Sequence, residues 1–347
     1  MQDACLNKLI DLCKEQGKEF DLIVDVGAWC GTWTLSMRQF AKNIHCYEPN
    51  NLQANAPLVF VAHGYTGSHT GIMNYCGMND IADQNGFAVC YPKGTTDNQW
   101  GGSNFWNVGY DFHNGINVDD VGFIINLAQY LQLNYNLSSD NTFFTGMSNG
   151  GELSYLLACE APGTFKAFAP VAGTIFPNGL TNNTCNASPI PIFEIHGSND
   201  NVTLFEGDPN DTFWGPYLGI DSIINYWVSI NGLSDLTIDT LPNLNNNNKY
   251  TISYKYSSLN SNNKVWLYKH KNGHNWDVDD IVVAQEIWDF FSLFLTSSTN
   301  VNDEFLNSNK KILKITDLLG RKINENKNQL SIYFYSNGSI EKKIYLK

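Results

Sequence analysis

The most constraining feature of this 347-residue sequence is a serine at the centre of the pentapeptide Gly146-Met-Ser-Asn-Gly150. Residues 141–145, directly before it, predict a strand, and residues 151–160, directly after it, predict a helix. A turn this tight between strand and helix strains the backbone at the serine, requires small neighbours and projects the hydroxyl above the sheet. We therefore expect Ser148 to be a nucleophile. A serine that only caps the helix is the structural alternative.

A serine hydroxyl is a weak nucleophile at neutral pH and needs a base, which is itself oriented by an acid. In enzymes that carry the serine on such a turn, the acid and then the histidine follow it along the chain. The histidines that remain are His196, His270 and His274. We prefer His274, because it lies in a loop between the last predicted strand and the helix predicted over residues 278–295. His270 ends a strand whose sheet fixes its direction, and we expect His196 to be structural and bonded to nearby backbone.

The orienting acid is expected in the loop that follows the predicted strand over residues 192–195. Asp200 lies in that loop, within His196-Gly-Ser-Asn-Asp200. Asp208 and Asp211 lie further along the chain, so Asp200 is the preferred acid.

Acyl transfer also needs two donors for the oxyanion of the tetrahedral intermediate. One is expected to be the backbone N–H of Asn149, which follows the nucleophile. The other is expected in the loop after the apolar run over residues 58–62, which reads His63-Gly-Tyr-Thr-Gly67. Gly64 allows the backbone to approach closely, so the N–H of Tyr65 is the preferred second donor, and we expect His63 to be structural.

Short apolar runs alternate with amphipathic stretches around these motifs. Val121, Ile124, Ile125, Ala128 and Leu131 follow the spacing of a helix face, and Asp119 or Asp120 is placed to cap that helix. The alternation predicts an α/β fold with a mostly parallel central sheet and helices on both faces. The apolar runs cover residues 58–62, 87–91, 142–145, 167–171, 192–195 and 265–268.

Seven motifs occur in order along the chain: His63-Gly64, Tyr91-Pro92, Val118-Asp-Asp-Val-Gly-Phe123, Gly146-Met-Ser-Asn-Gly-Gly151, Ala169-Pro-Val-Ala-Gly173, the His196 to Asp200 run and Gly273-His-Asn-Trp276. By these motifs the chain resembles, over residues 57–296, the poly(3-hydroxybutyrate) depolymerase/feruloyl esterase family of α/β-hydrolases. The resemblance implies an α/β-hydrolase fold and serine ester hydrolysis with no metal and no organic cofactor. It also implies feruloyl or other aryl esters, or hydroxyalkanoate oligomers and polyesters, as substrates; a non-catalytic surface-binding protein on this fold is the alternative.

Large aromatic residues in predicted loops are candidates for the substrate cleft. Trp276 follows His274 by two positions and is a candidate wall of the acyl pocket. Trp100 and Trp106 are further candidate substrate-binding residues, and Phe105 and Trp214 also lie in predicted loops. Ordinary packing is the alternative for each of them. An aromatic cleft suits an aryl ester or a polyester surface equally well.

The charge balance argues against a nucleic-acid or membrane partner. The sequence has 34 acidic and 21 basic residues, a formal net charge of −13, which repels nucleic acid and anionic membranes. No apolar run approaches the roughly 18 residues of a membrane span. Cys76, Cys90, Cys159 and Cys185 are candidates for two disulfides, for example Cys159 with Cys185, or for buried free thiols.

The sequence pattern of residues 1–52 differs from that of the hydrolase domain, which we expect over residues 53–298. Predicted strands over residues 20–26 and 44–47 flank a glycine turn and a helix, as in a nucleotide-type βαβ unit. The segment resembles the first motif of FkbM-type S-adenosylmethionine methyltransferases, which implies cofactor contacts by Asp25, Gly27, Gly31 and Glu48. A methyltransferase acting through residues 25–48 is therefore an alternative function. Because the rest of that family's fold is missing, we expect a non-functional fragment.

Residues 299–347 change character again and are rich in lysine and asparagine. Two strand-like runs, residues 311–316 and 330–335, flank Asp317-Leu-Leu-Gly-Arg321, and a turn precedes a basic end. This tail resembles the C-terminal sorting signal of type IX (Por) secretion in Bacteroidetes. The resemblance implies a secreted protein with the secretion machinery as a partner, although residues 1–17 do not have the pattern of a signal peptide.

Overall fold

The computed structural model describes residues 44–49, 52–98, 101–176, 185, 187–242, 248–296, 312–316, 323, 330–335 and 340–344. The chain divides into two compact units, Met1–Thr296 and Ser297–Lys347. The predicted cofactor-loop residues Asp25, Gly27 and Gly31 lie outside the described residues, as does Trp100.

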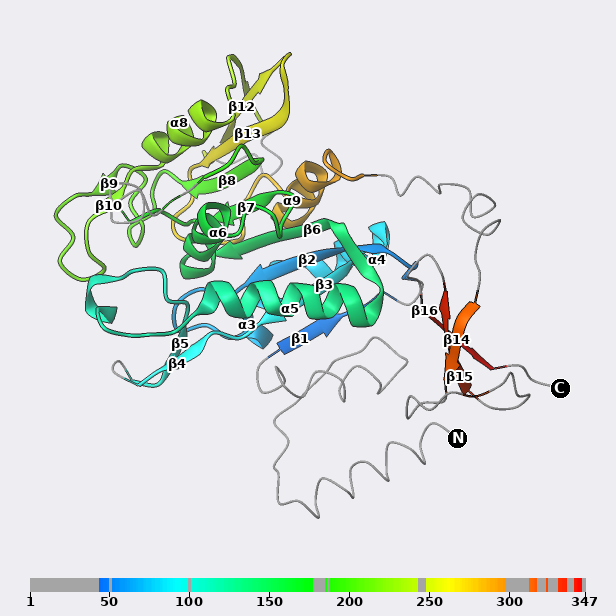
Figure 1. Ribbon diagram of the computed structural model, residues 1–347. Coiled ribbons are helices and arrows are strands. Elements are labelled where there is room, and N and C mark those ends of the chain that lie inside the picture. The colour runs from blue at the N-terminus through cyan, green and yellow to red at the C-terminus, as the bar shows by residue number, and fades with distance from the viewer. Residues whose placement is uncertain are drawn as a thin grey trace. The chain divides into compact units, whose positions relative to one another are not determined.

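The first unit is built on a nine-stranded sheet (Figure 1). Its six middle strands, from β3 to β13, pair in parallel, whereas β1, β12 and β11 join antiparallel at the two edges. The predicted α/β fold with a mostly parallel sheet is confirmed. In spatial order the strands are β1 (Ile44–Tyr47), β3 (Ala88–Pro92), β2 (Ala56–Ala62), β6 (Leu137–Met147), β7 (Phe168–Val171), β8 (Ile192–Gly197), β13 (Ser261–His270), β12 (Thr251–Ser258) and β11 (Asp235–Thr240).

Helices cover both faces of this sheet (Figure 1). One face packs against α5 (Asp120–Tyr135), α6 (Asn149–Glu160) and α8 (Ile220–Ile230). The other packs against α3 (His69–Cys76), α4 (Met78–Asn85) and α9 (Val283–Ser292). The last of these is shorter at both ends than the helix predicted over residues 278–295.

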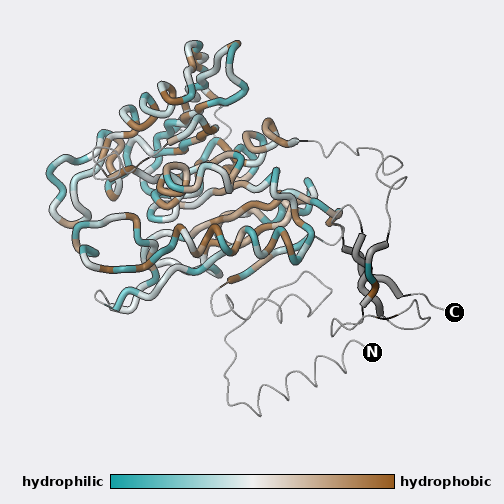
Figure 2. The backbone as a smooth tube through the Cα atoms, in the orientation of Figure 1, coloured by the Kyte–Doolittle hydropathy of each residue, from teal (hydrophilic) through white to brown (hydrophobic). Residues whose placement is uncertain are grey.

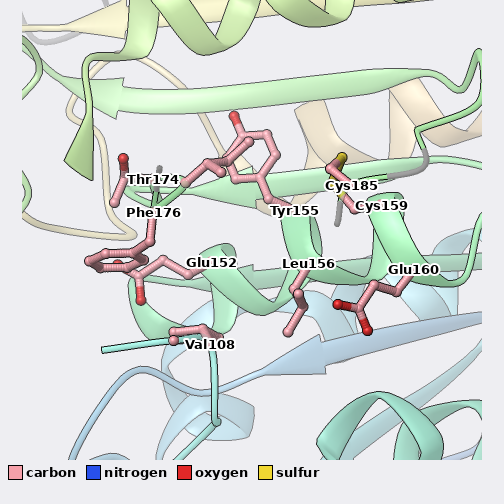
Figure 3. A pocket seen from close by; sticks show the side chains of 11 residues that line it. Val108, Glu152, Tyr155, Leu156, Cys159, Glu160, Thr174, Phe176 and Cys185 are labelled. Carbon is pink, nitrogen blue, oxygen red and sulfur yellow. A yellow bond between two sulfur atoms is a disulfide. The ribbon is translucent and has the colours of Figure 1, made fainter. Parts of the chain in front are cut away.

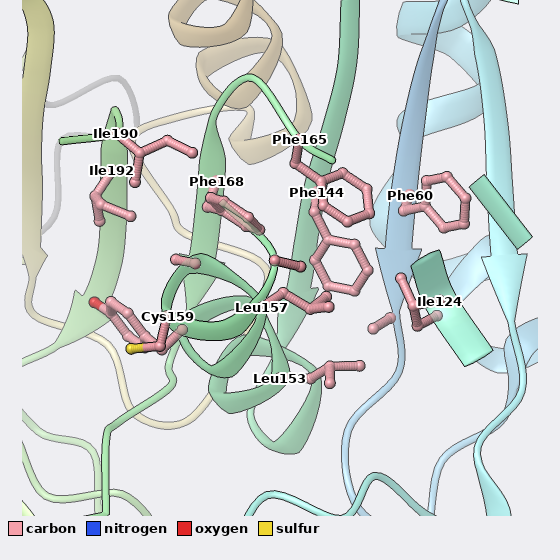
Figure 4. Close-up of a cluster of buried hydrophobic side chains, with 14 of the residues drawn as sticks. Phe60, Ile124, Phe144, Leu153, Leu157, Cys159, Phe165, Phe168, Ile190 and Ile192 are labelled. Atoms are coloured by element: carbon pink, nitrogen blue, oxygen red, sulfur yellow. The ribbon is translucent and has the colours of Figure 1, made fainter. Parts of the chain in front are cut away.

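The two faces divide the side chains of each central strand by their alternation. In β2, Leu58 and Phe60 belong to the core beneath α5 and α6, whereas Val59 and Val61 belong to the core beneath α4 and α9. Figure 4 shows Phe60, close to Ile124 of α5, in the first of these cores. Because both faces are buried, the central strands read as continuous apolar runs, and these runs are what the sequence displays.

Helix α5 follows the predicted pattern from its cap onward. The Asp119 side chain accepts a hydrogen bond from Gly122 N at 2.7 Å, so Asp119 is the N-cap. Hydrophobic and polar residues alternate along the helix in Figure 2, and the buried apolar ones include Ile124, Leu127 and Leu131. The helix ends at Asn136 in a left-handed conformation.

Strand β1 corrects the predicted boundary at residue 53. The segment over residues 44–47 was expected to be the second strand of the methyltransferase-like unit, with Glu48 at its end. It pairs antiparallel with β3 instead, from Ile44 opposite Pro92 to Tyr47 opposite Val89. The pairing satisfies the backbone groups of β3, which would otherwise be a sheet edge. This segment, with Glu48 after it, therefore belongs to the hydrolase sheet.

Two short strand pairs and a 3-10 helix lie in loops of the first unit. They are β4 (Thr95–Asp97) with β5 (Ser103–Phe105), β9 (Gly207–Asp208) with β10 (Tyr217–Leu218), and η1 (Asp111–His113). The second unit contains an antiparallel sheet of β14 (Ile312–Thr316), β15 (Leu330–Tyr335) and β16 (Ile340–Ile344). Its first two strands match the predicted runs, while the segment over residues 317–321 lies outside the described residues.

The described cysteines of the first unit adopt both of the expected states. Cys159, near the end of α6, forms a disulfide with Cys185 across a sequence separation of 26 residues. Cys46, Cys76 and Cys90 are free thiols, and the last two are buried. Within the described ranges no helix is long and apolar enough to cross a membrane.

Candidate active site

Ser148 occupies a strained turn between β6 and α6. Its φ of 55° and ψ of −121° lie in a region that residues other than glycine rarely adopt. Its N–H donates to Val171 O of the neighbouring strand at 2.8 Å, which holds the strained residue in place. The Ser148 side chain makes no capping hydrogen bond to α6, so the helix-cap alternative is not what the structure shows.

The glycines around Ser148 are required by close backbone contacts. A Cβ added at Gly150 would lie 2.4 Å from Ala62 O, and one added at Gly146 would lie 2.5 Å from Gly150 O. Both distances are far shorter than a carbon–oxygen contact allows, so the turn can pack against β2 only without these side chains. The pentapeptide pattern in the sequence is the direct consequence.

Asp200 and His274 meet above the carboxyl ends of neighbouring strands. His274 Nδ1 donates to Asp200 Oδ2 at 2.7 Å. The other carboxylate oxygen, Oδ1, accepts from the N–H groups of Val202 at 2.8 Å and Thr203 at 2.9 Å. This bonding assigns the Nδ1 proton to the carboxylate side and leaves Nε2 of His274 as the basic nitrogen.

The electrostatics of Asp200 favour the charged form. Burial by itself would raise the pKa of Asp200, but the hydrogen bond and the charge of His274, with the Val202 N–H, hold the pKa below its ordinary value. Asp200 is only 5% exposed, so its charge is directed at the imidazole rather than at solvent. The pair is therefore arranged to stabilise an imidazolium.

The other candidate histidines have structural partners. Buried His270 accepts the N–H of Asn272 at Nδ1, at 3.2 Å, and burial lowers the pKa of His270 to about 4. His196 bonds Glu194 Oε1 at 2.8 Å and donates from Nε2 to Thr203 O at 2.9 Å. The bond of His196 to Thr203 O agrees with the structural role predicted for this histidine, whereas its bond to Glu194 was not predicted.

The loop predicted to supply an oxyanion donor lies against the nucleophile. A Cβ added at Gly64 would lie 3.3 Å from Ser148 Cβ, so the backbone of this loop packs directly on the serine. Asn149 is the first residue of α6, where an N–H has no acceptor within the helix. The N–H groups of Tyr65 and Asn149 thus remain the predicted donors.

Several contacts hold this loop in place. His63 accepts Gly94 N at Nε2, at 2.9 Å, and donates from Nδ1 to Gly64 O at 2.8 Å, while burial lowers the pKa of His63 to about 4. Both imidazole nitrogens are therefore used by backbone groups, in agreement with the structural role predicted for His63. The Tyr65 hydroxyl donates to Asp97 at 3.0 Å.

The structure corrects the substrate-binding role predicted for two tryptophans. Trp106 and Trp276 are 0% and 1% exposed, so neither indole offers a surface to a substrate. Each N–H donates to a backbone carbonyl, Trp106 to His63 O at 2.9 Å and Trp276 to Cys76 O at 3.1 Å. Both rings pack inside the fold and donate hydrogen bonds to buried backbone carbonyls, which matches the alternative of ordinary packing.

A small pocket of about 10 Å³ adjoins Ser148 instead. Among the residues named from the sequence as lying in loops, Trp214 does line it. Glu152 was missed, although an acid in the first turn after the nucleophile was a visible signal. The complete lining is Tyr110, Ser148, Glu152, Thr174, Phe176, Val202, Thr203, Trp214 and Tyr217.

A second cavity of about 70 Å³ shares Glu152, Thr174 and Phe176 with this pocket. Figure 3 shows Glu152 and Phe176 at one end of this cavity, with the Cys159–Cys185 disulfide at the other. Glu152 therefore lines both the space beside Ser148 and the space along α6.

A family comparison agrees with this geometry. Residues 44–207 match the family model described as Esterase PHB depolymerase. Over this segment the chain is similar to the PHB depolymerase/feruloyl esterase family. The match begins at β1, which supports the corrected boundary of the hydrolase domain.

Relatives of this PHB depolymerase/feruloyl esterase segment carry esterase names. The bifunctional acetylxylan esterase/xylanase XynS20E of Neocallimastix patriciarum is 28% identical over 165 residues, which are 48% of this chain and 22% of that protein. Feruloyl esterase B of Talaromyces stipitatus is 26% identical over 227 residues, which are 55% of this chain and 58% of that protein. The chain thus spans less than two thirds of these relatives.

A solved structure of an acetyl xylan esterase from Aspergillus awamori has the same fold. It superposes with a TM-score of 0.52 at 19% identity, covering 72% of this chain and 93% of the other. At this identity the likeness establishes the fold only, and it confirms the predicted α/β-hydrolase architecture.

The glycine requirement gives a direct test of the turn. We expect Gly150→Ala to lower the free energy of unfolding by at least about 1–3 kcal/mol, because its Cβ would overlap Ala62 O. Urea unfolding followed by circular dichroism measures the change. Gly163→Ala is the matched control, since no atom lies within 4 Å of its Cβ position, and we expect no loss there. Equal stability of the two variants would contradict the packing described.

Proposed function

We propose that this protein is a serine carboxylic-ester hydrolase that works through an acyl-enzyme, with Ser148, Asp200 and His274 as its catalytic triad. The observation that carries the proposal is the 2.7 Å hydrogen bond between His274 and buried Asp200, in the unit that also holds Ser148 on a strained turn. The chain order and the esterase relatives support it further.

The reaction follows from these groups. Ser148 Oγ attacks the ester carbonyl carbon while His274 Nε2 takes the hydroxyl proton, and the resulting oxyanion accepts hydrogen bonds from the N–H groups of Tyr65 and Asn149. The carbon–oxygen bond to the alcohol then breaks, and His274 returns its proton to the leaving alcohol. A water molecule, deprotonated by the same imidazole, attacks the acyl-enzyme and releases the acid and free Ser148. Asp200 stabilises the imidazolium in both halves.

The triad is tested by single substitutions. We expect Ser148→Ala to abolish turnover of p-nitrophenyl acetate and labelling by a fluorophosphonate probe. Asp200→Asn should lower kcat by roughly 10⁴-fold, because it alters the imidazole tautomer. His274→Ala should be as severe as the serine variant, whereas the rival His270→Ala should retain labelling. Activity retained by a folded Ser148→Ala protein would reject the proposal. Loss of activity in His270→Ala but not in His274→Ala would assign the general base to His270.

The pocket beside Ser148 favours a short acyl group such as acetyl. The pocket is small, about 10 Å³, and three of its lining residues also line the neighbouring cavity of about 70 Å³. A small acyl group suits it best, whereas the cinnamoyl ring of the expected feruloyl esters or a hydroxyalkanoate chain would have to extend beyond it. Relatives named for acetylxylan hydrolysis agree with this choice, although others, such as feruloyl esterase B of Talaromyces stipitatus, are named for feruloyl esters. We therefore propose acetyl esters, including those of polysaccharides, as the substrate class.

A substrate panel with one widened pocket tests the acyl size. We expect the highest kcat/KM for p-nitrophenyl acetate and acetylated xylan, and much lower values for methyl ferulate and hydroxybutyrate oligomers. Trp214→Ala should raise activity on longer acyl chains relative to acetate, because it removes one wall of the pocket. Phe213→Ala, at a neighbouring ring that is 47% exposed, is the control and should leave the ranking unchanged. Preference of the unaltered enzyme for methyl ferulate would contradict this assignment.

We further propose that residues 299–347 act as a type IX sorting signal and make the enzyme extracellular. The separate compact unit with its three-stranded antiparallel sheet supports this role. In a host with type IX machinery, we expect esterase activity of the full chain in the medium and activity of a chain ending at Thr296 in the cells. Activity in the cell lysate shows that the shortened chain is folded. Equal partition of the two chains would reject the proposal.

A further inference from the structure

Glu152 is a buried carboxyl group one helical turn beyond the nucleophile. Its N–H donates to Ser148 O at 2.8 Å, and the residue is only 6% exposed. Its side chain lines the pocket that adjoins Ser148. A carboxyl group buried at such a position is costly unless other groups bond it, so its partners indicate what it does.

The partners of Glu152 belong to the site itself. Tyr110 donates its hydroxyl to Glu152 Oε2, and Asn149 Nδ2 donates to the same oxygen at 3.4 Å. The backbone of Trp106 also holds the side-chain amide of Asn149. The Trp106 backbone N–H donates to Asn149 Oδ1 at 2.7 Å, and the Trp106 carbonyl oxygen accepts from Asn149 Nδ2 at 3.0 Å. Glu152 thus bonds the residue whose backbone N–H is the proposed oxyanion donor, and the tyrosine that lines the same pocket.

Burial and a nearby acid disfavour a negative charge on Glu152, whereas two hydrogen-bond donors favour it. Burial raises the pKa of Glu152 to about 7, although the hydrogen bonds from Tyr110 and Asn149 act to lower it. The nearby charge of Glu194 on β8 raises the pKa further, and His196 on the same strand lowers it. Glu194 is itself bonded by Tyr155 at 2.8 Å and by His196 at 2.8 Å, so its charge is partly neutralised.

We propose that Glu152 is a positioning residue of the ester hydrolase site and works as an uncharged carboxylic acid that holds Asn149 and Tyr110 beside Ser148. The inference rests on the proposed function. Loss of the Glu152 proton would place a negative charge in the pocket next to the developing oxyanion. Two like charges in one buried site repel each other, so the charged form slows the attack of Ser148.

The pH profile distinguishes this role from a purely structural one. A structural role lowers the amount of active enzyme at every pH, whereas the positioning role affects kcat only where Glu152 loses its proton. His274 acts through its unprotonated form, so the alkaline loss cannot come from the base itself. Glu152→Gln keeps the acceptor oxygen for Tyr110 and Asn149 but cannot acquire a charge.

The experiment measures kcat and KM for p-nitrophenyl acetate from about pH 5.5 to about pH 9, with the Ser148→Ala protein as the blank for spontaneous hydrolysis. We expect kcat of the unaltered enzyme to fall roughly tenfold as pH rises through neutrality, with little change in KM. Glu152→Gln should keep its neutral-pH kcat over the whole alkaline range. Glu160→Gln, at the exposed end of the same helix, is the matched control and should keep the alkaline loss.

A second variant provides an independent measurement. The Tyr110 hydrogen bond lowers the pKa of Glu152, so Tyr110→Phe should raise that pKa and move the alkaline loss to higher pH. If Glu152→Gln does not fold, as judged by its circular dichroism, this shift decides the matter. An alkaline loss that is identical in the unaltered enzyme, Glu152→Gln and Tyr110→Phe would overturn the proposal.

Failure of this inference is distinguishable from failure of the proposed function. An unaltered enzyme that neither hydrolyses esters nor reacts with a fluorophosphonate probe at Ser148 would reject the hydrolase. An enzyme that does both, with the same pH profile in Glu152→Gln, would reject only the role of Glu152.

Discussion

The strained backbone of Ser148 is the constraint on which the rest of the site depends. The turn packs so closely on β2 that Gly150 has no room for a Cβ against Ala62 O, and the bond from Ser148 N to Val171 O ties it to β7. Strands β2 and β7 flank β6 in the centre of the sheet. The positive φ of Ser148 is therefore maintained by the two strands that a central position provides, and an edge strand would supply only one of them.

The parallel arrangement then brings the polar groups together. Because parallel strands end at the same edge of a sheet, the loops after β8 and β13 lie side by side, and Asp200 meets His274 there although 74 positions separate them. The β8–β13 pairing runs to His270 opposite Gly197, directly before both loops. The register of β8 and β13 thus sets the distance between Asp200 and His274, although the two residues are far apart in the sequence.

Beneath the site lies a second layer of buried polar groups. Glu194 and His196 bond each other, Glu152 bonds Asn149, and all three residues are at most 6% exposed. The charges of Glu194 and His196 act on Glu152 in opposite directions, because Glu194 raises its pKa and His196 lowers it. The Asp200–His274 pair is fixed by local hydrogen bonds, and it meets these buried groups at His196, whose Nε2 lies 3.5 Å from Asp200 Oδ2.

The sequence by itself determined the alternation of strands and helices, the turn at Ser148 and the order in which Asp200 and His274 follow it. The first two features are short-range, because a glycine pattern and an apolar period are visible within a dozen residues, and the order of the three side chains is read directly along the chain. The burial of Trp106 and Trp276, the pairing of β1 with β3 and the network around Glu152 were decided only by the tertiary structure. Each depends on which distant segments pack against a residue, and a tryptophan in a loop or a four-residue apolar run has the same local pattern whether it faces a substrate, another strand or the core.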